Sequence, residues 1–411
     1  MIIKLYKLKK LQVVLLLIFL FLISVSIEYT KFLDLKKEDI FEVDASILNI
    51  YPKDNFDILK FKTANFEFFS KLRKDENLKR LDLIFCTIDT RNIDFISYLK
   101  GIYTNIIYFE KVENKIGFKE KIIQNIKNNH TNLQIIEFFN TLFLAIPVSQ
   151  DLRDIFTNYG ISHVVALSGF HLVVLSFVIY WILYFPYSYF HQRFFPYRNK
   201  KFDILLVSIA ILFYYLVLTD VVPSLLRAFV LFCLGIFLLR SNIKIISYLT
   251  LLYTFLIVVA LYPKYIFSIG FWFSTVAVFY IYLFMQYFKN INKIVSMLFF
   301  NIWMFLIFNP IVHYFFPQTS IEQFYSIIIT IFFTIFYPFE IVAHIFHFSS
   351  YFDKYIEIFL NYKFYVYEVK TPLLFLISYV VCSFVSIFNK KAFFILNILM
   401  LGFNVYMYSV F

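Results

Sequence analysis

The sequence predicts a polytopic α-helical membrane protein with a small β-barrel domain near its N-terminus. Of the 411 residues, 61% are hydrophobic and 16% are charged, whereas soluble globular chains are nearer half apolar and a quarter charged. Several apolar runs are long enough to cross a hydrocarbon layer of ~30 Å, which takes about 20 helical residues. One region, 40–116, instead contains short stretches with strand-like patterning.

The first element is a transmembrane helix at 1–27. Four lysines precede an apolar run at 11–27, which places the N-terminus inside and residue 28 onward on the outer face. The end of this run has no small-x-small cleavage pattern, so the sequence predicts an uncleaved span rather than a signal peptide.

The region 40–116 is expected to be a small β domain on the outer, periplasmic side. Its strands are expected at 42–50, 58–63, 81–86 and 106–109. About 75 residues suffice for a five-stranded, OB-like barrel. Residues 28–120 carry 16 Lys and Arg against 17 Asp and Glu, so charge gives no indication of nucleic-acid binding there.

An amphipathic helical segment at 117–148 follows, with apolar residues near helical spacing, and is expected to lie along the membrane surface. Spans then follow in quick succession, and the last three are less regular because Pro338 interrupts the first of them. The predicted spans are 161–185, 202–219, 221–239, 243–262, 266–288, 294–316, 321–348, 371–388 and 392–411.

Charge gives these spans one consistent orientation up to residue 321. The net charge of +11 belongs mainly to the membrane part and its short loops. If 161–185 runs from outside to inside, the basic loops fall inside, as cytoplasmic loops should, and Asp220 and Lys264 fall outside. The inside residues are Arg193, Arg198, Lys200, Lys201, Arg240, Lys244, Lys289 and Lys293.

Three polar insertions interrupt spans that run in the same direction. The first contains His163, Ser168, Gly169 and His171; the second contains Pro223, Ser224 and Arg227; the third contains Gly270 and Ser274. At 1.5 Å per residue, all three lie between the outer surface and the midplane, which predicts one cavity open to the outside. Polar groups inside a membrane indicate function by default.

Other interpretations of these residues compete. His163 and His171 are about 80° and ~12 Å apart on a regular helix, too far to share a zinc ion. Ser168 and His171 are neighbours at i, i+3, but no carboxylate orients them as a hydrolase pair, and polar packing between helices is a further alternative. Arg227 either contacts phosphate, extends to the interface, or pairs with Asp220.

The remaining polar residues carry no assigned role. Glu340, His344 and His347 in the interrupted span are interpreted as interfacial. The cysteines Cys86, Cys233 and Cys382 form no CxxC or Cys/His cluster, so neither a zinc site nor a disulfide framework is expected. No cofactor is predicted. The 23% aromatic content accompanies an excess of Ile, Lys and Asn, as an AT-rich genome would produce, and therefore indicates little about function.

At its polar insertions the chain resembles the ComEC/Rec2 family of competence proteins. The family pattern Gly-x-Ser-His-Leu-Leu-Ala-Ile-Ser-Gly-Leu-His is matched nearly throughout from Gly160 to His171, with Phe170 where Leu is usual. Pro-Ser-x-x-Arg-Ala is matched from Pro223 to Ala228. A third pattern is matched less well from Gly270 to Ser274, because Trp272 replaces a Gln. Residues 92–102 resemble the end of the family's periplasmic domain.

The resemblance implies a channel in the inner membrane that translocates single-stranded DNA during natural transformation, and no enzyme activity. The competence (channel) domain would span 161–350, followed by C-terminal helices at 371–411. Larger members end in a metallo-β-lactamase-like domain, but this chain has no His-x-His-x-Asp-His run. The implied partners are a periplasmic DNA receptor, a cytoplasmic ATPase or helicase, single-strand-binding proteins and a separate nuclease; a homodimer stays open.

Two alternatives from other classes remain. One is an intramembrane hydrolase or lipid-modifying enzyme that uses Ser168 and His171. The other is a small-solute transporter, for which the sequence has no visible inverted repeat.

Overall fold

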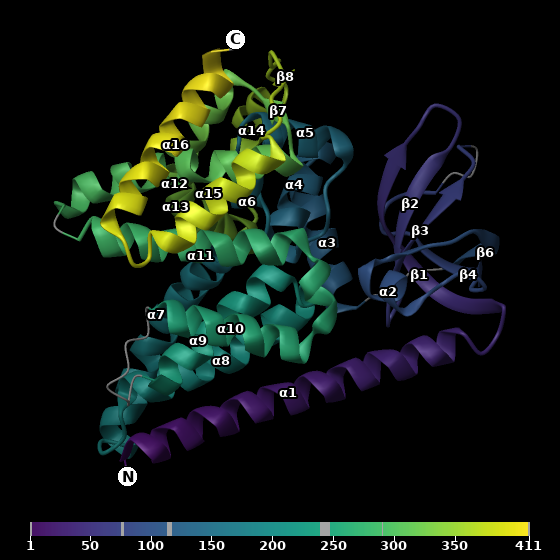
Figure 1. Cartoon of the computed structure of the whole chain (residues 1–411). Coiled ribbons are helices and arrows are strands. Elements are labelled where there is room, and N and C mark those ends of the chain that lie inside the picture. Colours follow the sequence, from purple (N-terminus) through teal and green to yellow (C-terminus); the bar gives the residue numbers. More distant parts are fainter. Residues whose placement is uncertain (1, 75–77, 113–116, 239–246, 290, 410–411) are drawn as a thin grey trace.

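A helical bundle with a β-sheet attached at one end makes up the molecule in the computed structural model (Figure 1). Seven helices among the described residues are long and apolar enough to cross a membrane, as expected for a multi-pass membrane protein. The structure describes residues 2–74, 78–112, 117–238, 247–289 and 291–409.

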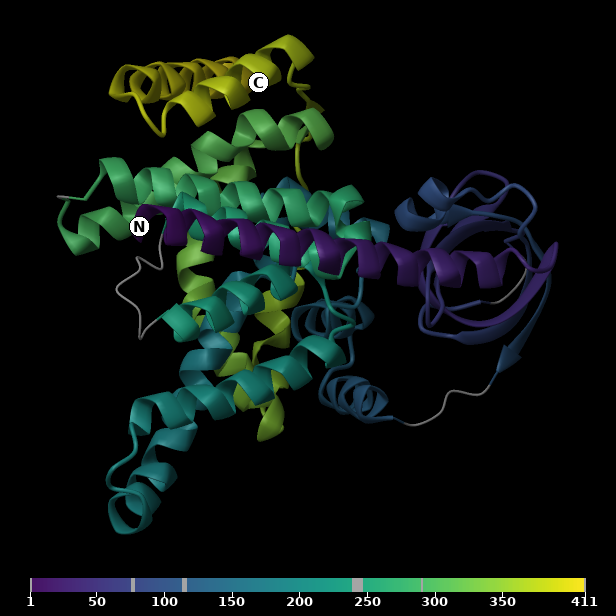
Figure 2. The same ribbon diagram turned by 60° about the horizontal axis from the view of Figure 1, so that its bottom comes forward.

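The first helix links the two parts. Helix α1 (Ile2–Leu35) runs along the bundle beside α10 and ends at the sheet. Its N-terminus lies at the end of the bundle away from the sheet (Figures 1 and 2). Phe32 and Leu35 are buried in the hydrophobic core of the sheet, so the sheet is anchored directly to this helix.

The predicted barrel is wrong, because the sheet is open. Its six strands have the order β5-β3-β2-β1-β4-β6, and β5 and β6 are unjoined edges. Strand β5 has only two residues, too few to continue a ladder around to β6. The strands are β1 (Ile40–Pro52), β2 (Asp57–Lys62), β3 (Glu67–Leu72), β4 (Leu83–Asp89), β5 (Ile102–Tyr103) and β6 (Ile106–Val112), with helix α2 (Phe95–Lys100) between β4 and β5.

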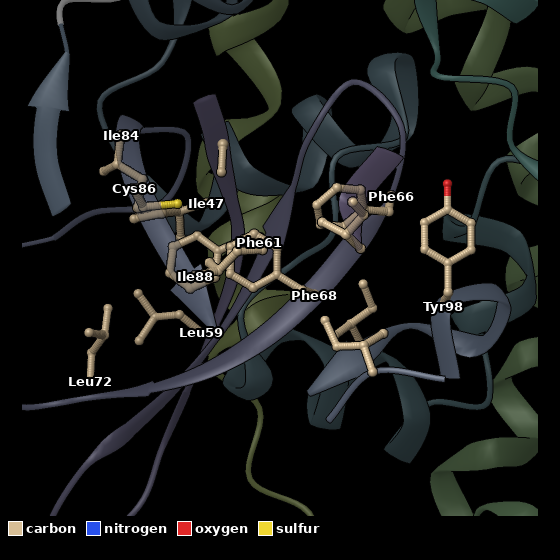
Figure 3. Packing of buried hydrophobic residues seen from close by; sticks show 14 of the residues in the cluster. Ile47, Leu59, Phe61, Phe66, Phe68, Leu72, Ile84, Cys86, Ile88 and Tyr98 are labelled. Carbon is tan, nitrogen blue, oxygen red and sulfur yellow. The ribbon is translucent and has the colours of Figure 1, made fainter. Parts of the chain in front are cut away.

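Strand β1 is central because each of its halves pairs with a different neighbour. Residues 40–46 pair with β4, and residues 46–52 pair with β2, with a register shift between Ile47 and Asn49. Alternate residues of the strands point into one core, which contains a stacked Phe61–Phe68 pair with ring centroids 4.8 Å apart (Figure 3). Period-2 patterning of this kind is what a sheet with one buried face requires.

Short helices cover the bundle near the sheet. The predicted helical segment at 117–148 is divided near His130 into two helices, α3 (Phe118–Asn129) and α4 (Leu133–Leu144). Helix α5 (Gln150–Asn158) follows, and Gly160 has a positive φ of 68°, a conformation that glycine adopts readily.

The membrane part begins with a broken helix. Instead of one span at 161–185, a single turn precedes a long helix that starts at Gly169. Most helices that follow lie close to the predicted spans, whereas the helix at 353–360 corresponds to none of them. The helices are α6 (Ser162–Val165), α7 (Gly169–Phe194), α8 (Lys200–Leu218), α9 (Pro223–Leu238), α10 (Tyr248–Leu261), α11 (Ile269–Tyr287), α12 (Lys293–Phe315), α13 (Tyr325–Ile345), α14 (Asp353–Leu360), α15 (Leu373–Val385) and α16 (Lys390–Ser409).

Short elements complete the fold. They are the 3-10 turns η1 (Pro263–Phe267), η2 (Ile321–Phe324) and η3 (Ser349–Phe352), and the two-stranded sheet of β7 (Gln318–Thr319) and β8 (Tyr367–Glu368).

The sheet contacts the bundle at one end only. Lys62 pairs with Asp220, Arg80 pairs with Glu137, and Lys100 lies over the ring of Phe267. The turn between α7 and α8 is at the opposite end of the bundle, where the N-terminus also lies (Figures 1 and 2). The basic positions Arg240 and Lys244 lie outside the described residues.

Candidate functional site

The break before α7 places Ser168 at the helix N-cap, where it forms a reciprocal pair with His171. Ser168 Oγ accepts from the backbone N–H of Phe170 at 3.3 Å. The backbone N–H of Ser168 donates to His171 Nδ1 at 3.1 Å. Because Nδ1 is thereby an acceptor, the hydrogen of a neutral His171 ring belongs on Nε2.

His171 points into the bundle, where its Nε2 finds no hydrogen-bond partner among the described residues. The residue is fully buried, with 0% exposure. Its ring meets that of Tyr337 on α13 edge-on, with centroids 4.6 Å apart. The unpartnered Nε2 therefore presents a buried N–H donor with no acceptor, an arrangement that normally costs ~1–3 kcal/mol.

Arg227 lies in the second turn of α9 and is 4% exposed. Its Nε donates to Ser274 Oγ on α11 at 2.9 Å, which joins the second and third polar insertions. Its Nη1 is buried and has no partner in the described part of the chain. The ion pair with Asp220 weighed from the sequence does not form, because Asp220 pairs with Lys62 and Lys119 instead.

Gly169 permits the close approach of α7 to α9. A Cβ atom at this position would lie 3.1 Å from Cβ of Ala228 and 3.5 Å from Nη2 of Arg227. Ser224 Oγ also donates to the carbonyl oxygen of Leu167 at 2.6 Å, which ties the start of α9 to the break before α7. The N-terminal ends of α7 and α9 are therefore held together, with Arg227 beside the break.

The structure brings together most, but not all, of the predicted residues. Ser168, Gly169, His171, Arg227 and Ser274 form one group, and Ser224 borders it.

Three other predicted residues are placed differently. Pro223 is the first residue of α9. His163 is exposed and lies 3.5 Å from Thr330 Oγ1 on α13, whereas Gly270 is exposed in the first turn of α11. Neither His163 nor Gly270 contributes to the Arg227 group.

Sequence reasoning missed Tyr337, which covers the ring of His171. The spacing of polar residues could have identified it. Tyr337, Glu340 and His344 recur at helical intervals, so these three polar residues share one side of an otherwise apolar helix. That pattern indicates an inward-facing side, but it does not identify which helix the side contacts.

The chemistry of this group favours binding an anion. Two helix N-termini, an arginine and a histidine N–H are donors, and helix N-termini favour negative charge. Buried donors act in a low dielectric, where their attraction for an anion is stronger than in water. Since His171 and Arg227 are buried, α7, α9 and α13 must separate before a ligand reaches them.

A hydrolase or metal site fits the group less well. Ser168 Oγ lies 3.2 Å from His171 Nδ1, but that nitrogen already accepts a backbone hydrogen bond. Across the residues that the structure describes, no group of three or more His, Cys, Asp or Glu side chains is placed to hold a metal ion.

Comparison with known proteins identifies a family. The family model described as Competence protein matches residues 147–406, from just before α5 into α16. This range includes the Arg227 group but excludes the β-sheet. No curated protein and no solved structure matches the chain.

Proposed function

The chain belongs to the Competence protein family, and from this membership we propose that it is a channel that carries single-stranded DNA across the inner membrane during natural transformation. The observation that supports the site is a pair of buried donors in the family-matched region, Arg227 Nη1 and His171 Nε2, which have no acceptor among the described residues. Phosphate oxygens of a DNA strand are the acceptors they lack.

In this proposal the open sheet lies in the periplasm and receives or orients the incoming DNA. The N-terminus is cytoplasmic, so the end of the bundle that contacts the sheet faces outward. One strand then passes between α7, α9 and α13 once they separate, and its phosphates contact Arg227 in turn. The forked guanidinium suits phosphate geometry, and the chain carries out no covalent chemistry on the strand.

The opposite end of the bundle would release the strand into the cytoplasm. Arg193, Lys200 and Lys201 supply positive charge there, whereas Arg198 is partly neutralised by its 2.8 Å pair with Asp203. Attraction of a polyanion to such residues weakens as salt rises.

Movement of the strand requires other proteins. The sequence contains no GxxxxGK[ST] loop, so a cytoplasmic ATPase or helicase would supply the energy, and single-strand-binding proteins would capture the product. A periplasmic receptor would deliver DNA, and a separate nuclease would degrade the strand that stays outside.

The rival functions predict different outcomes. An intramembrane hydrolase requires Ser168 as a nucleophile, yet the N-cap bonds of Ser168 already explain its position. A small-solute transporter would move its solute across the membrane of vesicles that contain only this protein, without DNA.

The experiment that tests the proposed function follows labelled duplex DNA in competent cells that lack this gene. We expect DNA to accumulate in the periplasm, protected from external nuclease, while labelled strand is lost from the cytoplasm. Restoring the gene should restore cytoplasmic label. Normal cytoplasmic label in the deletion strain would exclude the channel role.

A further inference from the structure

Four titratable side chains outside the Arg227 group form a continuous buried line. Asp353 Oδ1 lies 2.7 Å from His130 Nδ1, and His130 Nε2 lies 3.0 Å from His344 Nε2. His344 Nδ1 lies 3.5 Å from Glu340 Oε2, a charge contact too long for a hydrogen bond. The residues come from α13, the start of α14 and the junction of α3 and α4, and we name them the His130 quartet.

The hydrogen bonds of the His130 quartet require one more proton than a reference state in which both imidazoles are neutral and both carboxylates are ionised. His344 Nδ1 faces the backbone carbonyl of Glu340 at 2.8 Å, so this nitrogen carries a hydrogen. If His130 likewise donated from Nδ1 to Asp353, two bare Nε2 lone pairs would face each other across 3.0 Å. A proton between the rings removes this repulsion.

The alternative tautomer leads to the same count. If His130 carries its hydrogen on Nε2 and donates to His344, its Nδ1 becomes an acceptor. Asp353, 2.7 Å away, must then be protonated in order to donate. Either arrangement places one additional proton in the line.

The charge of the site favours uptake of a second proton. With neutral rings and two ionised carboxylates the site would carry two negative charges, which is costly in a buried environment. Glu340 is 0% exposed, and both its carboxylate oxygens lack hydrogen-bond partners within the described residues. One proton between the rings and one on Glu340 make the site neutral.

The surroundings offer little other compensation. The rings of Phe139 and Phe143 pack against the two histidines, with centroids 4.5 to 4.9 Å apart. His347 and Glu357 are the other titratable groups whose charges act on the line. Ser349 Oγ lies 3.3 Å from His130 Nε2.

Burial favours the neutral forms of His130 and Asp353. It lowers the pKa of His130 and raises the pKa of Asp353, and the attraction between the two groups offsets only part of each change. The Asp353 side chain is 21% exposed, His344 is 7% exposed, and His130 and Glu340 are fully buried. Protons from solvent therefore reach the line at Asp353.

We propose that the His130 quartet is a proton-binding site that sets how tightly α13 is held against α3, α4 and α14. A metal ion is the competing occupant of the space between two Nε2 atoms. Only two nearby atoms, the histidine nitrogens, are of the types that bind zinc, and the third neighbour is a serine hydroxyl. Zinc sites use three or four Cys, His, Asp or Glu ligands. Tyr337, three residues before Glu340, contacts His171, so α13 connects the quartet to the Arg227 group.

Infrared difference spectroscopy of the full-length protein in lipid nanodiscs tests proton binding directly. Stepping the pH should reveal the carbonyl stretch of a buried protonated carboxyl group. We expect Glu340→Gln to abolish this band and Asp353→Asn to change its pH dependence. The control His191→Gln, near the far end of α7, should leave the band unchanged. Thermal unfolding and size-exclusion profiles establish that each variant is folded.

Two results would overturn the proposal, and both can be obtained with the wild-type protein alone. One is the absence of any protonated buried carboxyl between pH 5 and 8. The other is tight binding of one zinc ion per chain when zinc chloride is titrated, because a metal would then occupy the space assigned to a proton.

A second arm, which rests on the proposed function, measures cytoplasmic DNA uptake at several external pH values. We expect Glu340→Gln to flatten the pH profile relative to wild type and to the control His191→Gln. An unchanged profile would exclude coupling to transport even if the infrared arm succeeds, so the two failures are distinguishable.

Discussion

Asp220 of the membrane bundle forms an ion pair with Lys62 of the β-sheet, with 2.9 Å between Oδ1 and Nζ. Its other oxygen contacts Lys119 on α3 at 2.6 Å. Although burial alone would raise the pKa of Asp220, the two lysines outweigh burial and lower it. Burial also lowers the pKa of Lys62 despite its partner, so the pair stabilises less than its distances suggest.

We predict that Asp220→Asn loosens the attachment of the sheet by about 1 kcal/mol or less, because partly exposed pairs contribute little. Hydrogen exchange should increase around Lys62 and Lys119 and stay constant in the buried helices. Asp89→Asn, which disrupts the Asp89–Arg91 pair within the sheet, is the matched control. Equal exchange at Lys62 in both variants would contradict the account.

This stabilisation should depend on pH in a defined direction. Because the folded pKa of Asp220 is below its usual value of about 3.9, the contribution is present above that value and disappears as pH falls through the folded pKa. The difference in unfolding temperature between wild type and Asp220→Asn should therefore be constant from pH 5 to 8 and vanish only under more acidic conditions.

Gly169→Ala should reduce DNA uptake, and Gly169→Leu should abolish it. A methyl group there would press on Ala228 and reach Arg227, so α7 and α9 must move apart. Gly402→Ala in α16 is the control, since nothing lies within 4 Å of its Cβ position. Normal uptake with Gly169→Leu at normal membrane abundance would show that this close approach is dispensable.

Ser168→Ala should retain a substantial fraction of uptake while lowering stability by ~1 kcal/mol, the usual cost of losing an N-cap. Ser247→Ala removes a comparable capping box at α10 and should destabilise similarly. Complete loss of activity in Ser168→Ala alone would instead indicate a nucleophile. Bulkier replacements of Ser168 should be the harmful ones.

Cys86 should be inert to maleimide at pH 8 while the sheet is folded. Burial, followed by the charge of Asp44, raises the pKa of its thiol to about 12, and the thiolate is the reactive form. In a Cys233→Ala/Cys382→Ala background, mass spectrometry should detect labelling only after denaturation. Rapid labelling of the folded protein would mean that the core in Figure 3 opens readily.

The helical spans could be predicted from sequence because every backbone group inside a membrane must bond within its own helix. Although the break before Gly169 was not predicted, the proximity of Ser168, His171, Arg227 and Ser274 was likewise accessible from their shared depth. Their burial was not, since depth along a helix says nothing about which neighbouring helix covers a side chain. Tyr337 therefore escaped notice.

The closed barrel was predicted from size and strand count, which do not determine whether edge strands meet. Strand β3 was missed because its sequence does not alternate clearly. Phe68, Ser70 and Leu72 point inward, but Phe69 is apolar and Ser70 is polar, which hides the pattern. The His130 quartet could not be predicted, because His130 and Asp353 are 223 residues apart and meet only in the folded chain.

The central claim is that Arg227 contacts the phosphates of a strand in transit. Its most direct test measures labelled DNA reaching the cytoplasm in cells that carry Arg227→Ala, Arg227→Lys, His171→Ala or the exposed control Arg153→Ala, at equal membrane abundance. Loss of a charged hydrogen bond worth ~1.5–3 kcal/mol predicts a decrease of about 10-fold or more for Arg227→Ala. We expect partial activity for Arg227→Lys, a reduction for His171→Ala, and wild-type activity for Arg153→Ala. Wild-type uptake in both Arg227→Ala and His171→Ala would contradict the account.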